Sequence, residues 1–274
     1  MAAARVEEVF GSATAQVTAD DARIDQLKEL LRSTPLDLDF ERVRIMYEMY
    51  GESAGDHQLL RRAKFLAAVL DRKKLYIDDN LFVGAMGGTL NAVYTYPEWQ
   101  VDWMVEENTV ENSPTPEDKA ANQWALDYWG PRGMKFRTEK IFEKRFGYDP
   151  KPCYDAGLIA AFHDWPAGGG NLDYPRVYRE GLASMIKDVE ERQMALDMRL
   201  PNLTKFYFYE ASLIVMRASI RYAHRYAELA RKMAAEEKDA TRKAELLAIA
   251  ETCEHVPEHP ARNLREAMQL SVSY

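Results

Sequence analysis

Cysteine is scarce in this chain, which has only Cys153 and Cys253 among its 274 residues. Two cysteines far apart in sequence and without a second pair support neither a disulfide framework nor a zinc site. We expect each thiol to be buried or idle rather than a nucleophile.

Basic charge and long apolar runs are lacking too. Lys and Arg number 36 against 44 Asp and Glu, giving a net charge of -8 and a pI near 5.3. This balance argues against nucleic acid or an anionic membrane as the main partner. No run approaches the roughly 18 apolar residues of a membrane span, and the first residues lack a basic start followed by an apolar core. A cytoplasmic protein is expected.

The familiar catalytic motifs are also missing. There is no phosphate-binding Gly-rich loop with Lys-Ser/Thr, no His-Glu-x-x-His and no Gly-x-Ser-x-Gly. Among five histidines only His255 and His259 have metal-ligand spacing, and Pro257 between them disfavours a shared helical face. His163 and Asp164 form an acid and base candidate, although such neighbours more often cap the following turn.

The chain does have a sufficient core and strong helical periodicity. Its apolar content of 47% is enough for a sizeable core. Thr115 before Pro116 marks a helix start, and Gly147 marks a helix end. Helices are predicted over residues 20–33, 39–51, 57–74, 113–130, 135–147, 174–198, 208–238, 240–256 and 261–274.

Two loops interrupt this helical pattern. "LYIDDNLFVGAMGGTLNAVYTYPEW", residues 75–99, predicts a small β-hairpin turning at Asp78-Asp79-Asn80, followed by a long aromatic loop. "HDWPAGGGNLDYP", residues 163–175, contains three consecutive glycines, which permit close approach of the backbone to another surface.

Aromatic and basic groups leave alternatives open. The aromatic residues of the first loop either line a pocket or pack the loop onto the helices. Phe206, Tyr207, Phe208 and Tyr209 pose the same choice. Arg61-Arg62 binds a carboxylate or serves a solvated or interface role, of which the second is the more common.

The helix predicted from residue 208 carries its charges in a single stripe. The rest of its circumference is largely apolar, so most of the helix should be buried. The stripe consists of Glu210, Arg217, Arg221, His224, Glu228 and Arg231.

Several runs, taken together, resemble a known family. They are "RRAKFLAAVLDRKKLYIDDNLFVGAMGGTLNAVYTYPEWQVDW", "LDYPRVYREGLASMIKDVEE" and the long stretch from "YFYEASLIVMRASIRYAHRY" to "ARNLREAMQL". From about Asp37 to the last residue, their order resembles the N-terminal part of glycyl radical enzymes, the pyruvate formate-lyase-like superfamily. The resemblance divides the chain into an N-terminal arm with its first helix, residues 1–36, and the N-terminal part of the family domain, residues 37–274.

This resemblance implies a fold and a chemistry. The fold is a mainly α-helical outer layer with a small β-hairpin, wrapping a ten-stranded α/β barrel. Family members carry a thiyl-forming cysteine in the barrel and a glycyl radical near the C-terminus, installed by an iron-sulfur, S-adenosylmethionine-dependent activase. Both lie beyond position 274, and neither Cys153 nor Cys253 matches the family's cysteine loop. No catalytic residue and no bound cofactor is therefore expected in this chain, and family members are commonly homodimers.

Within the family the sequence most resembles arylacetate decarboxylases, which act on indoleacetate, phenylacetate or hydroxyphenylacetate. Diol dehydratases have a histidine in a Gly-His-x-x-x-Asp run, and aligned on Asp173 this chain has Gly169. Loss of the imidazole leaves room for a bulkier aromatic acid. "FYFYEA" resembles the segment that lends an aromatic to the decarboxylase pocket, with Phe208 as the best match. The substrate-pocket candidates are Phe208, Tyr207, His163 and Gly169.

The function therefore has three interpretations. The first is an N-terminal part of a decarboxylase, or of a diol dehydratase, formate acetyltransferase or other glycyl radical lyase, joined to the rest of the barrel in the same or a separate chain. The abrupt apolar end "NLREAMQLSVSY" suggests that the natural fold continues. The second is an inert helical binding or regulatory protein derived from the family, and the third is a small enzyme using His163 and Asp164.

Overall fold

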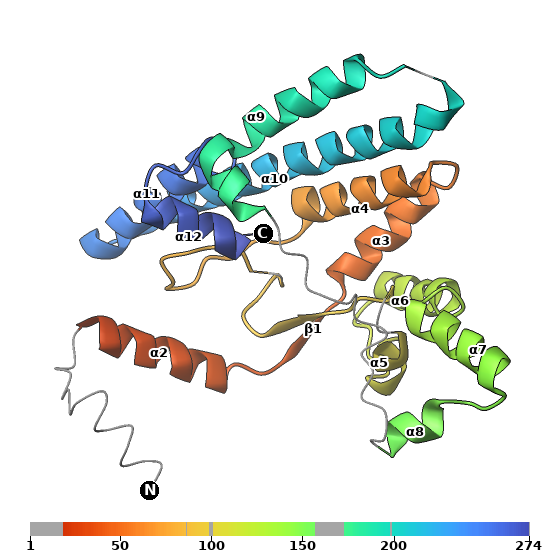
Figure 1. Ribbon diagram of the computed structural model, residues 1–274. Coiled ribbons are helices and arrows are strands. Elements are labelled where there is room, and N and C mark those ends of the chain that lie inside the picture. The colour runs from red at the N-terminus through yellow and green to blue at the C-terminus, as the bar shows by residue number, and fades with distance from the viewer. Residues whose placement is uncertain (1–18, 86, 99–100, 157–172, 198, 274) are drawn as a thin grey trace, which may run out of the picture. The chain divides into compact units, whose positions relative to one another are not determined.

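The computed structural model describes residues 19–85, 87–98, 101–156, 173–197 and 199–273. Contacts divide the chain into two units, Met1–Leu36 and Asp37–Tyr274, and each is considered separately. The described residues are mainly helical with one small parallel sheet (Figure 1). None of the described helices is both long enough and apolar enough to cross a membrane.

The described part of the first unit is α2 (Ala19–Ser33), which confirms the helix predicted there. Thr34 Oγ1 donates to the carbonyl oxygen of Leu30 at 2.6 Å and closes the last turn. Lys28 pairs with Asp25 one turn earlier at 3.2 Å.

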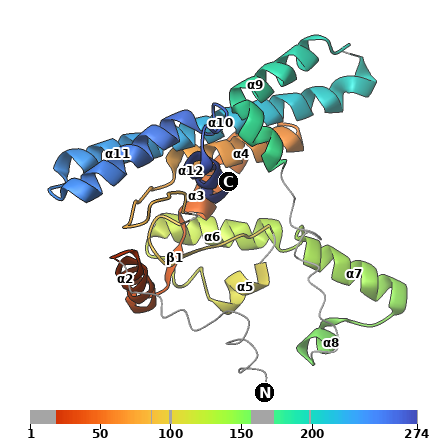
Figure 2. The same cartoon turned by 60° about the vertical axis from the view of Figure 1, so that its left-hand side comes forward.

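The second unit is organised around α10 (Leu203–Glu236), which follows a short 3-10 turn, η1 (Leu200–Asn202). This helix packs against α4 (Gln58–Arg72), α9 (Tyr174–Met194) and α11 (Ala240–His255), as Figures 1 and 2 show. The last helix, α12 (Leu264–Ser273), contacts α9 and α11. The periodic apolar positions of α10 thus lie between three helices, and the main core forms there.

Two tyrosines dominate that main core. Tyr222 and Tyr226 of α10 are 2% and 1% exposed, and they pack with Ile249 and Cys253 of α11. Their rings meet edge to face at 5.1 Å, a favoured aromatic geometry. Burial raises the pKa of the Cys253 thiol to about 12. This residue is therefore a core side chain, as its isolation in the sequence predicts.

A second core joins α3 (Glu41–Glu52) to α4 and to α6 (Pro116–Trp129). Tyr50 of α3 meets Phe65 and Trp124 edge to face at 6.1 and 5.8 Å. The remaining described helices of this part of the chain are α5 (Val101–Glu106), which contacts α6, α7 (Met134–Phe146) and α8 (Lys151–Asp155).

Helix ends follow the expected chemistry. Thr115 caps α6, since its hydroxyl accepts from the Asp118 amide at 3.1 Å. α7 ends at Gly147, whose φ of 78° is the left-handed conformation that glycine adopts without strain. Both predicted boundaries are confirmed.

The predicted hairpin over residues 75–99 is wrong. The described sheet is instead a parallel pair in which β1 (Asp37–Asp39) lies beside β2 (Ala92–Tyr94), with Leu38 opposite Val93. Asp39 also accepts from the amides of Glu41 and Gly88, both at 2.9 Å, and so ties the sheet to the start of α3. The turn at Asp78-Asp79-Asn80 does form, because the Asn80 amide donates to Asp78 Oδ1 at 2.9 Å.

The hairpin does not form because side chains of α11, α12 and the end of α4 bind backbone groups that strand pairing would use. Gln269 of α12, 2% exposed, accepts from the Val83 amide at 3.1 Å and donates to the Val83 carbonyl at 2.6 Å. Arg242 donates to the Asp78 carbonyl at 2.6 Å. Lys73 donates to the Ala85 carbonyl at 2.6 Å. Residues 75–85 are thus held as an irregular segment that bends at Asp78-Asp79-Asn80.

Lys73 is itself buried, with 5% exposure. Its ammonium lies over the Tyr222 ring, 4.7 Å from the centroid. Burial is the main reason that its pKa falls to about 8, and the nearby Arg225 acts in the same direction while Asp39 opposes it.

The helix α9 is interrupted at Gly181, which has a φ of 70°. The amides of Leu182 and Ala183 donate to the carbonyls of Pro257 and Glu258 at 2.8 and 3.0 Å. A Cβ at Gly181 would lie 2.5 Å from the Glu258 carbonyl oxygen, so only glycine fits this close approach of two backbones.

Candidate functional site

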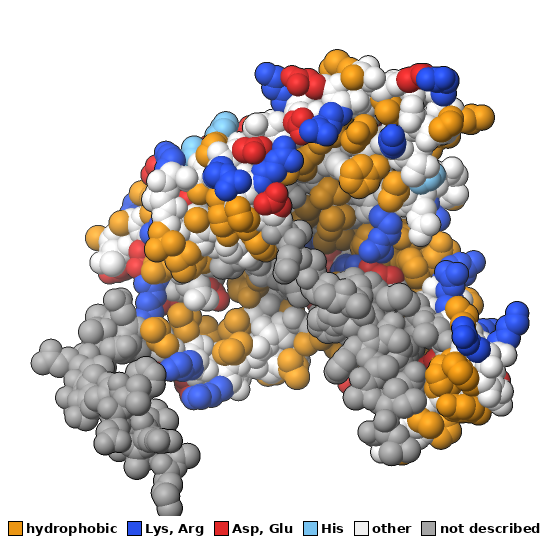
Figure 3. Space-filling view, in the orientation of Figure 1, with side chains coloured by type: hydrophobic (Ala, Val, Ile, Leu, Met, Phe, Trp, Pro, Cys, Tyr) orange, Lys and Arg blue, Asp and Glu red, His pale blue; other side chains and the backbone are white. Residues whose placement is uncertain are grey.

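A groove of about 660 Å³ lies between α4, α9 and α10. Its size falls within the range of small-molecule sites. In Figure 3 orange apolar side chains gather in the hollow beside these helices. The apolar lining comprises Leu59, Ala63, Phe65 and Leu66 of α4, Met185 and Val189 of α9, and Phe208, Ala211, Val215 and Met216 of α10.

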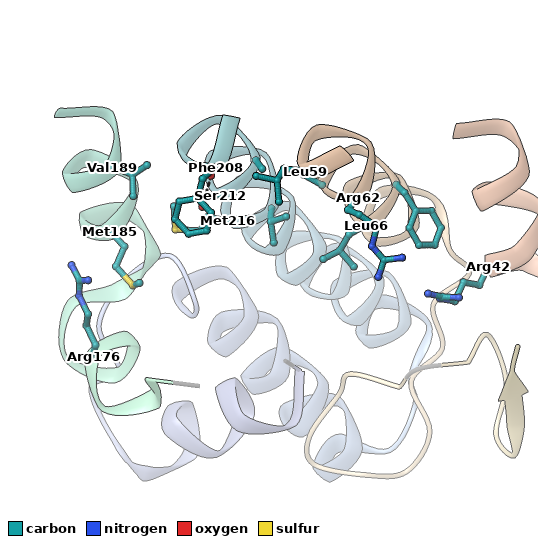
Figure 4. A pocket seen from close by; sticks show the side chains of 14 residues that line it. Arg42, Leu59, Arg62, Leu66, Arg176, Met185, Val189, Phe208, Ser212 and Met216 are labelled. Atoms are coloured by element: carbon teal, nitrogen blue, oxygen red, sulfur yellow. Dashed lines mark hydrogen bonds between the residues drawn. The ribbon is translucent and has the colours of Figure 1, made fainter. Parts of the chain in front are cut away.

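Helical spacing brings these residues to one surface. On α10 the lining positions Phe208, Ser212 and Met216 are successive turns of one face. On α4 the positions Leu59 and Leu66 are two turns apart and face them (Figure 4). The groove therefore forms because the apolar faces of α4 and α10 lie opposite each other and their side chains do not fill the space between them.

Phe208 and Tyr207, both predicted pocket residues, have different surroundings in the structure. Phe208 lines the groove and is 57% exposed. Tyr207 is half-buried and stacks on His57, the N-cap of α4, with ring centroids 4.4 Å apart and planes 12° apart. Phe208 can contact a ligand, whereas Tyr207 holds α10 against α4.

Two arginines, Arg42 and Arg62, lie at one end of the groove (Figure 4), and both contact Glu98. Arg42 of α3 makes a two-pronged contact with Glu98, in which its Nη1 donates to Oε2 at 3.1 Å and its Nη2 reaches Oε1. Arg62 of α4 donates to the same Oε1 at 3.3 Å. The guanidinium of Arg42 also lies over the Tyr96 ring, 4.3 Å from its centroid. The two cations therefore share one carboxylate.

Glu98 is 6% exposed. Burial by itself would raise its pKa, but the hydrogen bond and charge of Arg42, together with the charge of Arg62, hold it below the usual value. The carboxylate is therefore ionised at neutral pH. With two arginines around it, this cluster carries a net single positive charge.

The groove has a third arginine, Arg176 of α9, at a separate place in its lining. It donates to Glu180 at 2.9 Å and to Asp188 at 3.2 Å. Two carboxylates thus contact this cation, in contrast to the single carboxylate between Arg42 and Arg62.

Arg61 and Arg62 were both considered for carboxylate binding. Within the described part of the chain, only Arg62 contacts a carboxylate, that of Glu98. Arg61 donates to the Tyr50 carbonyl at 2.9 Å and lies over the Tyr50 ring at 4.5 Å. Arg61 is a packing residue, and the carboxylate that Arg62 meets belongs to the protein.

His163, Asp164 and Gly169 lie outside the described residues, so their predicted roles stay predictions. Within the described part of the chain, no group of His, Cys, Asp and Glu side chains is arranged to hold a metal ion. The charged stripe of α10 forms pairs with its neighbours, such as Arg221 with Asp71 at 2.7 Å.

The sequence reasoning missed Arg42, Glu98, Met185 and Val189. Arg42 and Glu98 are 56 positions apart, so no local spacing connects them. The sequence offered one signal, namely that Glu98 is an acid placed between Pro97 and Trp99 in the aromatic part of the first loop.

Comparisons with known proteins agree on a family. A model of the pyruvate formate lyase-like family matches residues 14–273. The chain is 32% identical over 266 residues to an isethionate sulfite-lyase of Desulfovibrio desulfuricans, covering 90% of this chain and 32% of that protein. It is 40% identical over 146 residues to an indoleacetate decarboxylase of Tractidigestivibacter scatoligenes, covering 52% and 15% respectively.

A solved structure gives the same result. A protein of Roseburia inulinivorans described for 1,2-propanediol dehydration superposes with a TM-score of 0.75 and 27% identity, covering 91% of this chain and 31% of its own. The chain thus spans about a third of the length of these relatives.

Proposed function

The chain belongs to the pyruvate formate lyase-like family of glycyl radical enzymes, and we propose that it forms a substrate-facing helical wall in a glycyl radical lyase, an arylacetate decarboxylase. In this proposal the rest of the barrel, in the same or a separate chain, supplies the radical glycine and the thiyl-forming cysteine. An activating iron-sulfur enzyme is the expected partner, and a homodimer the expected assembly.

The observation that carries the proposal is the exposed Phe208 in an apolar groove. Met185, Val189 and Met216 surround the same space, and methionine packs favourably against aromatic rings. A planar ring of the phenyl or indole class would bury this surface, whereas a small diol would leave most of it uncovered. The chain contributes binding and exclusion of water, and the reaction would release CO2 and a methylarene.

A second candidate is a dehydratase or sulfite-lyase. The relatives that match about 90% of this chain have those activities, and the decarboxylase matches 52%. The whole-chain comparison therefore favours this candidate, while the apolar lining favours the decarboxylase.

The test is an anaerobic assay of the activated enzyme that contains these residues. Indoleacetate, phenylacetate and hydroxyphenylacetate are compared with glycerol, 1,2-propanediol and isethionate. Release of CO2 and methylarene from an arylacetate supports the proposal, and Phe208→Ala should raise KM for that substrate by roughly tenfold. Turnover of a diol or of isethionate without any arylacetate turnover would overturn it.

A further inference from the structure

The arginine end of the groove has features that its apolar lining does not explain. Arg42 is 9% exposed, and Glu98 and the Thr95 carbonyl, 3.1 Å from its Nη1, both accept from it. Arg62 differs, because its side chain is 41% exposed and meets Glu98 at the longer distance of 3.3 Å. Arg42 therefore holds Glu98 in place, and Arg62 keeps accessible donors at the groove.

The charges are unequal at this end. One buried carboxylate lies between two guanidinium groups, so one positive charge has no equivalent negative charge within the cluster. An arginine presents its donors in a planar fork that suits the two oxygens of a carboxylate. Next to an apolar wall that limits water, such a charge attracts an anion more strongly than it would on an open surface.

The apolar wall and this charge line the same groove. Phe208, Ser212 and Met216 follow one another at single turns of α10, so each step along the helix is about 6 Å. Figure 4 shows Arg62 and Leu66 across from this row of α10 residues. The length of a small aromatic acid matches one to two such steps.

We propose that Arg62 is the anion anchor of the groove, which binds a small organic acid with its acid group on the Arg62 guanidinium and its apolar body against Phe208 and Met216. This proposal deepens the proposed function and rests on it for the arylacetate class, since the groove itself calls only for an apolar acid. The anchor would also discriminate between the two substrate classes, because a neutral diol has no charge with which to bind the Arg62 guanidinium.

Binding to the purified 274-residue chain tests the anchor without any radical chemistry. Indole-3-acetate and its neutral analogue indole-3-acetamide have nearly the same shape and differ in charge. Isothermal titration should show the acid binding at least roughly tenfold more tightly than the amide. Arg62→Gln should remove that preference and leave amide binding within about twofold.

A matched control comes from the same helix. Arg72 is 44% exposed against 41% for Arg62, pairs with Glu48, and is not part of the groove lining. Arg72→Gln removes the same charge and should keep the preference for the acid. Circular dichroism verifies the fold of each variant.

Three results would overturn the anchor: equal binding of acid and amide to the unchanged chain, no binding of either, or an unchanged preference in Arg62→Gln. The comparison of acid with amide needs no variant, so it decides even if Arg62→Gln fails to fold. An acid preference that depends on Arg62, together with no decarboxylation by the activated enzyme, would support the anchor and defeat the proposed function alone.

Discussion

The two halves of α10 are built from similar residues and differ in how much of their apolar surface is buried. In the second half Tyr222, Tyr226 and Ala230 are 2%, 1% and 0% exposed. In the first half Leu203 and Phe208 are 38% and 57% exposed. The second half packs on α11 and on the segment 75–85, whereas one face of the first half, including Phe208, lines the groove.

The difference shows that apolar composition does not reveal which part of a helix is core. Burial of aromatic surface in the second half stabilises the chain. The same kind of surface in the first half lies exposed along the groove, where another molecule can cover it. A single helix therefore provides stability at one end and, under the proposed function, recognition at the other, and the following changes test that division.

The largest difference in stability is expected between two variants that each lose one aromatic side chain, one in each half of α10. Tyr226→Ala deletes a fully buried ring and should lower the free energy of unfolding by about 3 to 5 kcal/mol. Phe208→Ala should change it by less than about 0.5 kcal/mol. Urea unfolding followed by circular dichroism measures both, and similar losses in the two variants would contradict the division.

The next effect concerns the segment that covers the second half. Gln269→Leu leaves the amide and carbonyl of Val83 without the partner described above, which should cost about 3 kcal/mol. Hydrogen exchange at the Val83 amide should accelerate in parallel. Gln123→Leu serves as the control, because Gln123 is exposed and pairs with Asp127. Equal stability of the two variants would show that the segment is held by other contacts.

The buried Lys73, whose ammonium lies over the Tyr222 ring, predicts that the free energy of unfolding depends on pH. Its pKa of about 8 in the folded chain lies below the value of about 10.4 expected when unfolded. Between these values the unfolded chain binds more protons, so the free energy of unfolding rises with pH, by roughly 2 kcal/mol from about pH 7.5 to about pH 9.5. Lys73→Met removes the titrating amine and should lack this rise. Parallel pH profiles for the two proteins would refute the assignment.

The smallest effect on stability is expected in the first half of α10. Phe208→Ser should reduce the fluorescence of a bound hydrophobic dye while the free energy of unfolding stays within about 0.5 kcal/mol. Leu247→Ser on α11 changes a side chain of comparable exposure, 49%, outside the groove lining and should leave dye binding nearly unchanged. An equal fall in both would mean that the dye does not report on the groove.

Local chemistry was enough to predict most helices. Thr115 and Gly147 mark helix ends through contacts or angles that involve only their neighbours in sequence. The described helices of the predicted set therefore form close to their expected positions. The short α5 was missed because six residues give too little periodicity to recognise.

Long-range pairing could not be predicted in the same way. Residues 75–83 have the composition of strands, yet Gln269, 186 positions away, supplies the partner of Val83. The parallel sheet joins residues 37–39 to 92–94, and no turn connects them to reveal the pairing. Phe208 was predicted to be a substrate-pocket residue from resemblance. Its exposed place in the groove that Arg62 also lines emerged only when three helices were assembled.

The interruption of α9 at Gly181 affects how the residues that line the groove can change during evolution. The bonds that hold this wall in place run from the amides of Leu182 and Ala183 to carbonyls of another segment. Main-chain bonds do not depend on side-chain identity, so Met185 and Val189 can be exchanged without loosening the frame that carries them. Natural selection can therefore vary the lining one residue at a time on an unchanged support, an arrangement suited to a lineage whose members act on isethionate, indoleacetate and hydroxyproline.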